Sequence, residues 1–466
     1  MASLEQREHE NYRVIVLARD RTGILVVPHN GHFQLPSIDI PPGQRTAESL
    51  CRVVKNELGC EAVCLFTLQD LLGGGSWENQ HYQIMECWER PGTCNSTTLW
   101  APIRSLSRQS FDDVEDYGAI EQVSAKLNLS SADSCLPFAR PEWFRELRDW
   151  ISEEIRPLGI QLTGRVRQFN SSPTFSLLRL ETSGPAVWFK AVGEPNQREF
   201  GITLKLAELL PDYLPKIIST RPEWNGWLSF EAEGANLADT REISAWEKAA
   251  TTLARLQIDS IISTSDIGAS GARDLSAAAL SDLLGPFFDV IAQLMKQQTK
   301  IPPTALNELE LHSLEEIVQD SLTRMEDLSI TDTIGHLDLN PGNIIVSPFE
   351  CRFLDWAEAY IGNPIFSFEY LLEHFRRSAG ADPAFETTIT AAYIEEWHSR
   401  TPTAALNEAL RLSPLLAAFA YAAANEIWRD QEKLNDPITA GYLRSLTRRM
   451  HREAKQLCER RSLCLC

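Results

Sequence analysis

The sequence lacks the patterns that mark secreted, zinc-binding and membrane-spanning proteins. Its ten cysteines are scattered and form no Cys-x-x-Cys pair, so neither a zinc site nor a thioredoxin-like motif is indicated. No segment approaches the roughly eighteen consecutive apolar residues of a membrane span. The first residues are mostly polar and contain no apolar signal core. We therefore expect a cytoplasmic protein, in a reducing compartment, without a membrane partner.

Basic residues are few in this chain. It carries 44 Lys and Arg against 64 Asp and Glu, which gives a formal net charge of −20. An acidic protein repels a phosphate backbone, so nucleic acid is not expected as the main partner. The charge would favour a cationic small substrate, although solubility alone also explains it. The length of 466 residues, with 43% hydrophobic and 23% charged residues, indicates a globular protein of two or three domains.

The residues most suggestive of chemistry lie in one late stretch, residues 334–356. Apolar β-type runs flank a Pro-Gly turn there, which predicts a loop, a strand, a turn and a second strand. Asp338 lies in the loop, Asn343 follows five positions later, and Asp355 ends the second strand. Phosphoryl transfer requires a carboxylate that orients the attacking hydroxyl, and an amide and a carboxylate that hold Mg²⁺ against the nucleotide phosphates. These three residues suit those roles, although each alone is also an ordinary turn or cap residue.

His336, Asp338 and Asn343 form the pattern His-x-Asp-x-x-x-x-Asn, which resembles the catalytic loop of the aminoglycoside phosphotransferase and choline kinase families. The loop of those families reads His-Gly-Asp-x-x-x-x-Asn, and Leu337 replaces its Gly. The resemblance implies a Mg²⁺-dependent kinase that transfers phosphate from ATP or GTP to the hydroxyl of a small molecule. Asp338 would orient and deprotonate the acceptor, Asn343 and Asp355 would hold Mg²⁺, and His336 would brace the loop. No Ala-Pro-Glu follows Asp355, so a small molecule is preferred to a protein as the acceptor.

Residues 138–232 are expected to form the small β lobe of such a fold, led by an amphipathic helix. Lys190 lies in the third strand-like run, and a Lys on a central apolar strand is costly to bury unless it is paired. Glu199 opens the following helix and is the natural partner, with Glu194 and Glu208 as alternatives. The resemblance places Lys190 on the nucleotide phosphates and Glu199 beside it. The alternative is that Lys190 lies on an edge strand and extends its ammonium group to solvent.

Two further segments of the small lobe would contact the nucleotide. The turn over residues 170–174 contains no Gly-x-Gly-x-x-Gly, but backbone N–H groups and the hydroxyls of Ser171 and Ser172 could bind phosphate there. The run over residues 227–232, which includes Ser229 and Glu231, resembles the hinge strand that pairs with adenine through backbone groups. Neither segment is specific in isolation.

Residues 233–466 are expected to form the large helical lobe, which walls the acceptor pocket in the related kinases. The pattern predicts separate helices over residues 404–411 and 414–436. The related families usually have an Asp at the position of Ser367, which helps to order the catalytic loop. How the loop that contains Asp338 is ordered without this Asp is left open. Several side chains could face a cationic acceptor, although each is also an ordinary surface or core residue: Glu373, Glu395, Glu396, Glu426, Asp430, Trp397 and Trp428.

Residues 1–137 follow the order strand, Leu-Pro turn, helix, Gly, strand, which resembles a Nudix hydrolase domain. Arg52, Glu57 and Gly59 match positions of the Nudix box. Glu57 is the one acid of the box helix that this sequence keeps, and it cannot hold a Mg²⁺ cluster alone. We therefore expect a Nudix-like α/β domain that does not hydrolyse diphosphates and is used for binding, docking or assembly. A working hydrolase would depend on Glu57. Other box positions have lost their Gly or acidic residue: Ile38, Gln44, Val53 and Asn56.

The sequence therefore predicts an α+β protein in which a Nudix-like domain precedes a protein-kinase-like domain with a small antiparallel β lobe and a large helical lobe. The main alternative is a non-catalytic scaffold whose two enzyme-like folds bind nucleotide or a partner. The presence of Asp338 and Asp355 favours an enzyme, because a retired site would be expected to lose them first. The acceptor and the oligomeric state are left open.

Overall fold

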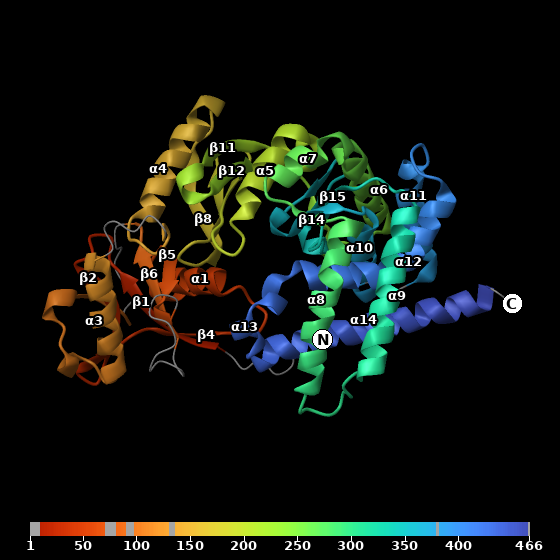
Figure 1. Ribbon diagram of the computed structural model, residues 1–466. Helices are drawn as coiled ribbons and strands as arrows, with labels where there is room; N and C mark the ends of the chain where they lie inside the picture. The colour runs from red at the N-terminus through yellow and green to blue at the C-terminus, as the bar shows by residue number, and fades with distance from the viewer. Residues whose placement is uncertain (1–9, 70–80, 90–96, 130–135, 379–381, 465–466) are drawn as a thin grey trace. The chain divides into compact units, whose positions relative to one another are not determined.

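The computed structural model describes residues 10–69, 81–89, 97–129, 136–378 and 382–464. It forms two compact units (Figure 1). The first contains Met1–Phe200 and Lys216–Glu231, and the second contains Gly201–Pro215 and Ala232–Cys466. The mixed α+β content that the sequence predicts is confirmed.

The first unit begins with a seven-stranded mixed sheet in which β3-β2-β1-β6-β5 is the main order. β4 pairs with β1, β7 pairs with β2, and β1 runs parallel to β6. The strands are β1 Glu10–Leu17, β2 Gly23–His29, β3 His32–Gln34, β4 Ser37–Ile40, β5 Ala62–Thr67, β6 His81–Cys87 and β7 Leu99–Pro102.

Helices cover both faces of this sheet. On one face α1, Thr46–Leu58, buries Leu50 and Val54 against Val14 and Val16. Residues Ile15 and Leu17 point to the other face, because side chains alternate along a strand. They share a core with α3, Val114–Leu129, and α4, Trp143–Ile155. Helix α1 ends at Leu58, and Gly59 adopts φ 70° directly after it, which agrees with the predicted order of helix and Gly.

A second, five-stranded antiparallel sheet follows in the order β11-β12-β10-β9-β8. The apolar face of the predicted amphipathic helix, α4, is buried, and Trp143, Phe144 and Phe189 belong to one core that also includes the first sheet. This helix therefore joins the two sheets of the first unit. The strands are β8 Leu162–Ser171, β9 Ser176–Thr182, β10 Val187–Ala191, β11 Ile217–Arg221 and β12 Gly226–Phe230. Helix α5, Arg198–Leu209, follows β10 and belongs to the second unit from Gly201 onward.

The second unit is mainly helical and holds two three-stranded sheets, β13-β16-β17 and β14-β18-β15. Its strands are β13 Ala235–Asn236, β14 Arg273–Leu275, β15 Thr333–His336, β16 Ile344–Val346, β17 Cys351–Phe353 and β18 Ala359–Gly362. Its helices are α6 Ile243–Ser260, α7 Thr264–Ala269, α8 Ala277–Lys296, α9 Glu308–Asp327, α10 Ile365–Ser378, α11 Pro383–Trp397, α12 Thr403–Ala424, α13 Gln431–Leu434 and α14 Pro437–Cys464.

The predicted break before Pro414 is wrong. Helix α12 runs through Pro414 without interruption, and its buried Leu and Ala side chains pack into the core on both sides of the proline. The chain leaves the helix only after Ala424, where the Asn425 side chain accepts the Ile427 N–H at 3.3 Å and starts a short 3₁₀ turn. Burial of the apolar face therefore outweighs the local cost of the proline.

Helix α8 is long and apolar enough to cross a membrane by length and composition. It is the one such helix found among the residues described. Its Leu284, Phe287 and Ile291 are buried in the core of the second unit. A core helix of this kind passes the same test as a membrane span, so the helix gives no support for membrane insertion.

Candidate active site

The loop that contains Asp338 begins where β15 ends. β15 pairs with β18, and Gly335 lies opposite Tyr360. A Cβ atom on Gly335 would lie 2.0 Å from the Tyr360 ring, so only glycine allows the ring to pack there. In the sequence, Gly335 is a single glycine before His336, and nothing there predicts that the Tyr360 ring packs against it.

His336 braces the loop through both ring nitrogens. Its side chain is fully buried; Nδ1 accepts the backbone N–H of Asp338 at 3.0 Å, and Nε2 donates to the backbone oxygen of Leu354 at 3.0 Å. Burial lowers the pKa of His336, which favours the neutral ring that this pair of hydrogen bonds requires. His336 therefore connects the Asp338 loop to the strand end that precedes Asp355.

Ser367 takes part in ordering the same loop. Its Oγ accepts the backbone N–H of His336 at 2.7 Å and lies 3.0 Å from the Tyr360 hydroxyl, which donates to the backbone oxygen of Asn363 at 3.0 Å. All of these groups are buried. Ser367 therefore holds the backbone at the start of the Asp338 loop, at the position where the related families usually have an Asp.

Two asparagines hold Asp338. Asn343 donates from Nδ2 to the Asp338 backbone oxygen at 2.9 Å and to Oδ2 at 3.4 Å. Asn340 donates to Asp338 Oδ1 at 3.1 Å, and its own Oδ1 accepts the Gly342 N–H at 2.8 Å. Asn340 is not predicted by the sequence pattern, in which its only signal is its place before a Pro-Gly turn. The amide nitrogen of Asn343 is engaged, so its carbonyl oxygen is the atom suited to a cation.

Asp355 follows β17 and has φ 66° and ψ 62°, a left-handed conformation that costs energy for a residue with a side chain. Ile344 pairs with Phe353, and the Leu354 N–H donates to the Asn343 oxygen at 2.9 Å. This register brings the backbone of Asn343 next to the strand end that carries Asp355. A strained residue held in this way is typical of a functional site.

These side chains fit a magnesium ion by their chemistry. Mg²⁺ in nucleotide sites takes one or two protein oxygens, and phosphate and water supply the others. The Asn343 amide and the Asp355 carboxylate provide such oxygens. Among the described residues, no group of three or more His, Cys, Asp or Glu side chains could hold a metal ion.

Lys190 and Glu199 form an ion pair in the first unit. Lys190 Nζ lies 2.5 Å from Glu199 Oε1, and the side chains are 13% and 1% exposed. The alternative Glu208 instead pairs with Lys205 at 2.7 Å. The structure therefore selects Glu199, and burial of the carboxylate explains why it needs a cation. The phosphate-binding role of Lys190 stays a prediction.

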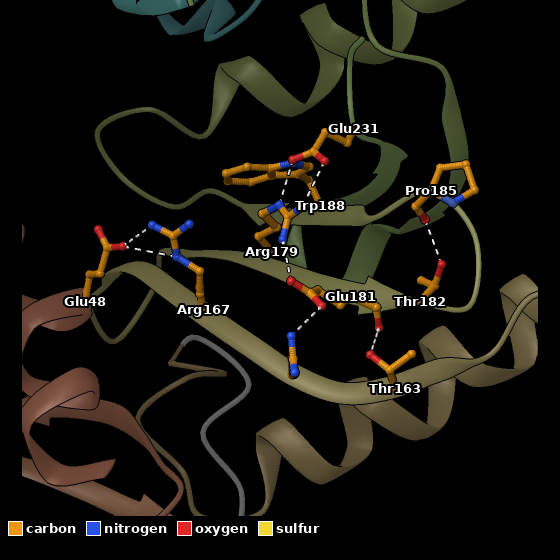
Figure 2. Close-up of polar contacts among 10 residues, drawn as sticks. Glu48, Thr163, Arg167, Arg179, Glu181, Thr182, Pro185, Trp188 and Glu231 are labelled. Atoms are coloured by element: carbon orange, nitrogen blue, oxygen red, sulfur yellow. Dashed lines mark hydrogen bonds and ion pairs between the residues drawn. The ribbon is translucent and has the colours of Figure 1, made fainter. Parts of the chain in front are cut away.

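The other predicted nucleotide contacts have structural partners of their own. The Ser171 hydroxyl donates to the backbone oxygen of Cys64 at 3.1 Å, and Ser172 Oγ accepts the Phe175 N–H at 3.1 Å. Ser229 lies in β12 and is buried. Figure 2 shows the Glu231 carboxylate, which accepts two hydrogen bonds from Arg179 and one from Trp188 Nε1. Only the backbone atoms of these segments are therefore plain candidates for nucleotide contacts.

The side chains suggested for a cationic acceptor have other roles. Trp397 and Trp428 are buried, so neither offers a free ring face. Four of the five carboxylates lie in ion pairs or caps: Glu373 with Arg377 and Arg449, Glu395 with His398, Glu396 with Arg255, and Asp430 with Lys433 and the start of α13; Glu426 is exposed.

Aromatic side chains of α10, α12 and α14 form a separate group in the second unit. The Tyr370 and His374 rings of α10 are 5.1 Å apart, and Tyr370 lies 6.0 Å from the Tyr421 ring of α12. Tyr442 of α14 donates to the Tyr421 hydroxyl at 3.0 Å. Burial, and then the charge of Asp338, raise the pKa of Tyr370. We call these four residues the aromatic cluster.

The Nudix-like box residues lie on and after α1. Arg52, Asn56 and Glu57 are exposed, and Gly59 ends the helix. Among the altered positions, Ile38 is buried and Gln44 Oε1 accepts the Ser49 hydroxyl at 3.0 Å. The sheet with helices on both faces agrees with an α/β domain, and the Nudix-like assignment itself stays a prediction.

Part of the chain matches a known protein family. Residues 197–403 match the phosphotransferase enzyme family. The match includes the Asp338 loop, Asn343 and Asp355. The prediction of a phosphotransferase is confirmed at the level of this family. A comparison with curated protein sequences found no match.

Solved structures of small-molecule phosphotransferases are similar to this chain. A choline kinase from Streptococcus pneumoniae is 17% identical, covers 67% of this chain and 99% of its own, and has a TM-score of 0.43. A macrolide 2'-phosphotransferase from Brachybacterium faecium is 16% identical, with 65% and 97% covered and a TM-score of 0.42. A choline kinase from Cryptosporidium parvum is 12% identical, with 67% and 96% covered and a TM-score of 0.44. Such distant likenesses transfer no residue role to this chain.

Proposed function

We propose that this protein is a Mg²⁺-dependent phosphotransferase that moves the γ-phosphate of ATP or GTP to a hydroxyl of a small molecule. The observation that carries the proposal is the buried His336 ring, which links the backbone of Asp338 to that of Leu354, next to Asp355, while Asn343 donates to the Asp338 backbone oxygen. These segments carry the carboxylate, the amide and the second carboxylate that phosphoryl transfer uses.

Each residue has a stated part in this function. Asp338 orients the acceptor hydroxyl and accepts its proton. Asn343 donates to the Asp338 carboxylate, and His336 holds the Asp338 backbone N–H. Lys190 binds the nucleotide phosphates, and Glu199 holds its ammonium group in place. Asn343 and Asp355 are the residues that would hold Mg²⁺. When bound, the ion neutralises charge on the transferred phosphate.

The aromatic cluster supplies the acceptor side of the proposal. Tyr370 and His374 are close enough to Asp338 for its charge to act on their pKa values. Tyrosine rings offer an apolar face and a hydroxyl, which suits a ring-shaped acceptor with several hydroxyl groups. A cationic acceptor would have to compete with arginines already paired to Glu373.

The remaining parts of the proposal concern the first domain and the cell. We assign residues 1–137 to a Nudix-like fold that does not hydrolyse diphosphates, because α1 carries Val53 and Asn56 where that chemistry needs acids. The chain contains ten cysteines without a paired motif, which fits a cytoplasmic enzyme.

A thermal-shift assay and a transfer screen test this function. The unfolding temperature should rise with ATP or GTP plus Mg²⁺, and the rise should be much smaller without Mg²⁺ and in Asp355→Ala. Purified protein is then screened for phosphate transfer to amino sugars, amino alcohols, sugars and nucleosides, with Asp338→Asn as the inactive control. A nucleotide shift without any transfer, equal in wild type and Asp338→Asn, would favour the non-catalytic scaffold. A shift that is the same in Asp355→Ala would contradict the metal assignment.

A further inference from the structure

The first unit contains a cavity of about 340 Å³ that is separate from the residues of the proposed reaction. Its walls come from α1, from the segment around β5, from the end of β6 and from β8. This volume is in the range of sites that bind small molecules. The lining residues are Glu48, Cys51, Arg52, Lys55, Asn56, Glu61, Ala62, Val63, Trp88, Val166, Arg167 and Gln168.

The charged side chains of this cavity give it a positive excess. Lys55 pairs with Glu61 at 2.5 Å, and Arg167 donates from Nε to Glu48 at 3.2 Å (Figure 2). Both lining carboxylates are thus matched by a cation. Arg52 is exposed and forms no ion pair or hydrogen bond with the residues that the structure describes. A cationic cavity is unexpected on a chain with a net charge of −20, so the excess is a local feature rather than a reflection of composition.

The rest of the cavity is mainly apolar, and its walls are held in place by neighbouring side chains. Ala62 and Val63 are buried, and Trp88 is fixed by Phe144, 5.4 Å from its ring, and by Arg148, 4.6 Å away. Gln168 is 2% exposed; its Oε1 accepts the Cys64 N–H at 2.7 Å, and its Nε2 donates to the Cys64 oxygen at 3.2 Å. The wall formed by β5 and β8 is therefore preformed, which reduces the entropic cost of binding.

We propose that this cavity binds a small organic anion, a phosphate or carboxylate group on an apolar ring. The anionic group lies at Arg52, between the Lys55 and Arg167 pairs, and the ring lies against Val63, Val166 and Trp88. Arg52 is the group that gains most, because its guanidinium forms charge-assisted hydrogen bonds only when the ligand is present.

Direct binding to the full-length protein tests this site without reference to catalysis. The probe is 1-naphthyl phosphate, followed by calorimetry, with 1-naphthol and inorganic phosphate as the ring-only and anion-only comparisons. We expect the probe to bind more tightly than either part. Arg52→Gln should weaken binding about tenfold, which is the loss of one charge-assisted contact. Arg108→Gln, a matched change at an exposed arginine away from the cavity, should leave it unchanged.

A second variant tests the position of the ring. Val166→Phe fills the space beside β8 and should remove probe binding while 1-naphthol also loses affinity. Thermal unfolding shows whether each variant keeps the wild-type fold. The proposal is overturned if wild type does not bind the probe at about millimolar concentration. It is equally overturned if Arg52→Gln and Val166→Phe bind the probe as wild type does, since the probe then occupies another site. Either failure leaves the proposed phosphotransfer untouched.

Discussion

The Nδ1 atom of His336 accepts the backbone N–H of Asp338 at 3.0 Å, while the opposite ring nitrogen donates to the residue before Asp355. A single neutral imidazole thus links the segment of the proposed base to the segment of the proposed metal ligand. Because the ring is fully buried, this link is protected from water.

This geometry predicts a graded effect of substitution at His336. His336→Leu removes both hydrogen bonds and should lower kcat about 10- to 100-fold, in the range seen when groups that orient a reactive residue are lost. In His336→Asn the side-chain oxygen can still accept the Asp338 N–H, so the loss should be smaller. Steady-state kinetics with the acceptor found in the screen measure both. Equal kcat values in the two variants and wild type would show that the brace has no catalytic role.

The Lys190–Glu199 pair predicts that stability and activity can be separated. Glu199→Ala leaves the largely buried Lys190 without this carboxylate and should cost about 3–5 kcal/mol in the free energy of unfolding. Lys190→Met with Glu199→Leu removes both charges and should recover most of that loss. Urea unfolding measures the stability of both variants. The double variant should nevertheless fail in phosphate transfer, and retained transfer would exclude Lys190 from the phosphate site.

The Lys190 pair and the Asp338 loop could be predicted because their signals are local. A charged residue on an apolar strand requires a partner, and the acids and amide of the loop lie within twenty residues of one another. The roles of Ser367 and Asn340 could not be predicted in this way. Ser367 acts by contact with the β15–β18 pair, and Asn340 acts through a turn whose geometry depends on Asp338.

The contacts between residues 1–137 and β8 could not be predicted from the sequence either. Ser171 was expected at the nucleotide, yet its hydroxyl binds Cys64, more than one hundred positions earlier in the chain. Gln168 binds the same residue, and no spacing rule relates the two positions. Polar residues that join separate segments satisfy backbone groups wherever the fold leaves them unpaired, so their partners follow from tertiary structure alone.

Gln168 should therefore matter for the stability of the first unit. Gln168→Leu removes the acceptor of the buried Cys64 N–H and one of the two donors to the Cys64 oxygen, which keeps the Ser171 hydroxyl, and should cost about 1–3 kcal/mol. Gln109→Leu changes an exposed glutamine and should have little effect. Urea unfolding followed by tryptophan fluorescence measures both. A loss no greater than that of the control would mean that water replaces the side chain at Cys64.

Gly335 predicts a steric effect beside the candidate active site. Gly335→Ala places a methyl group 2.0–2.4 Å from ring and hydroxyl atoms of the buried Tyr360, which must then move. We expect a loss of about 1–3 kcal/mol, as for other overpacked cores, and a lower kcat because His336 is the next residue. Tyr360→Leu in the same chain should relieve part of the strain. If Gly335→Ala unfolds at the same temperature as wild type, the ring is free to rotate away.

Glu86 predicts a pH dependence of stability in the first unit. Its carboxylate is 4% exposed and accepts the Glu142 N–H at 2.8 and 3.0 Å, directly before α4. Burial raises the pKa of Glu86 from 4.5 to about 7. The folded state therefore binds more protons than the unfolded state between these values, and the contribution of Glu86 to stability falls as the pH rises.

Replacement of Glu86 by Gln removes this titration. The stability of Glu86→Gln relative to wild type should rise by about 1.4 kcal/mol per pH unit between about pH 5 and pH 7, and should stay constant above that range. Urea unfolding at pH 5, 6, 7 and 8 measures the difference, with Glu89→Gln as the control at an exposed position. Other titrating groups cancel in the comparison, because both proteins contain them. A difference that does not change with pH would mean that Glu86 is ionised in the folded protein throughout, held by the Glu142 N–H and the nearby Arg21 and Arg145.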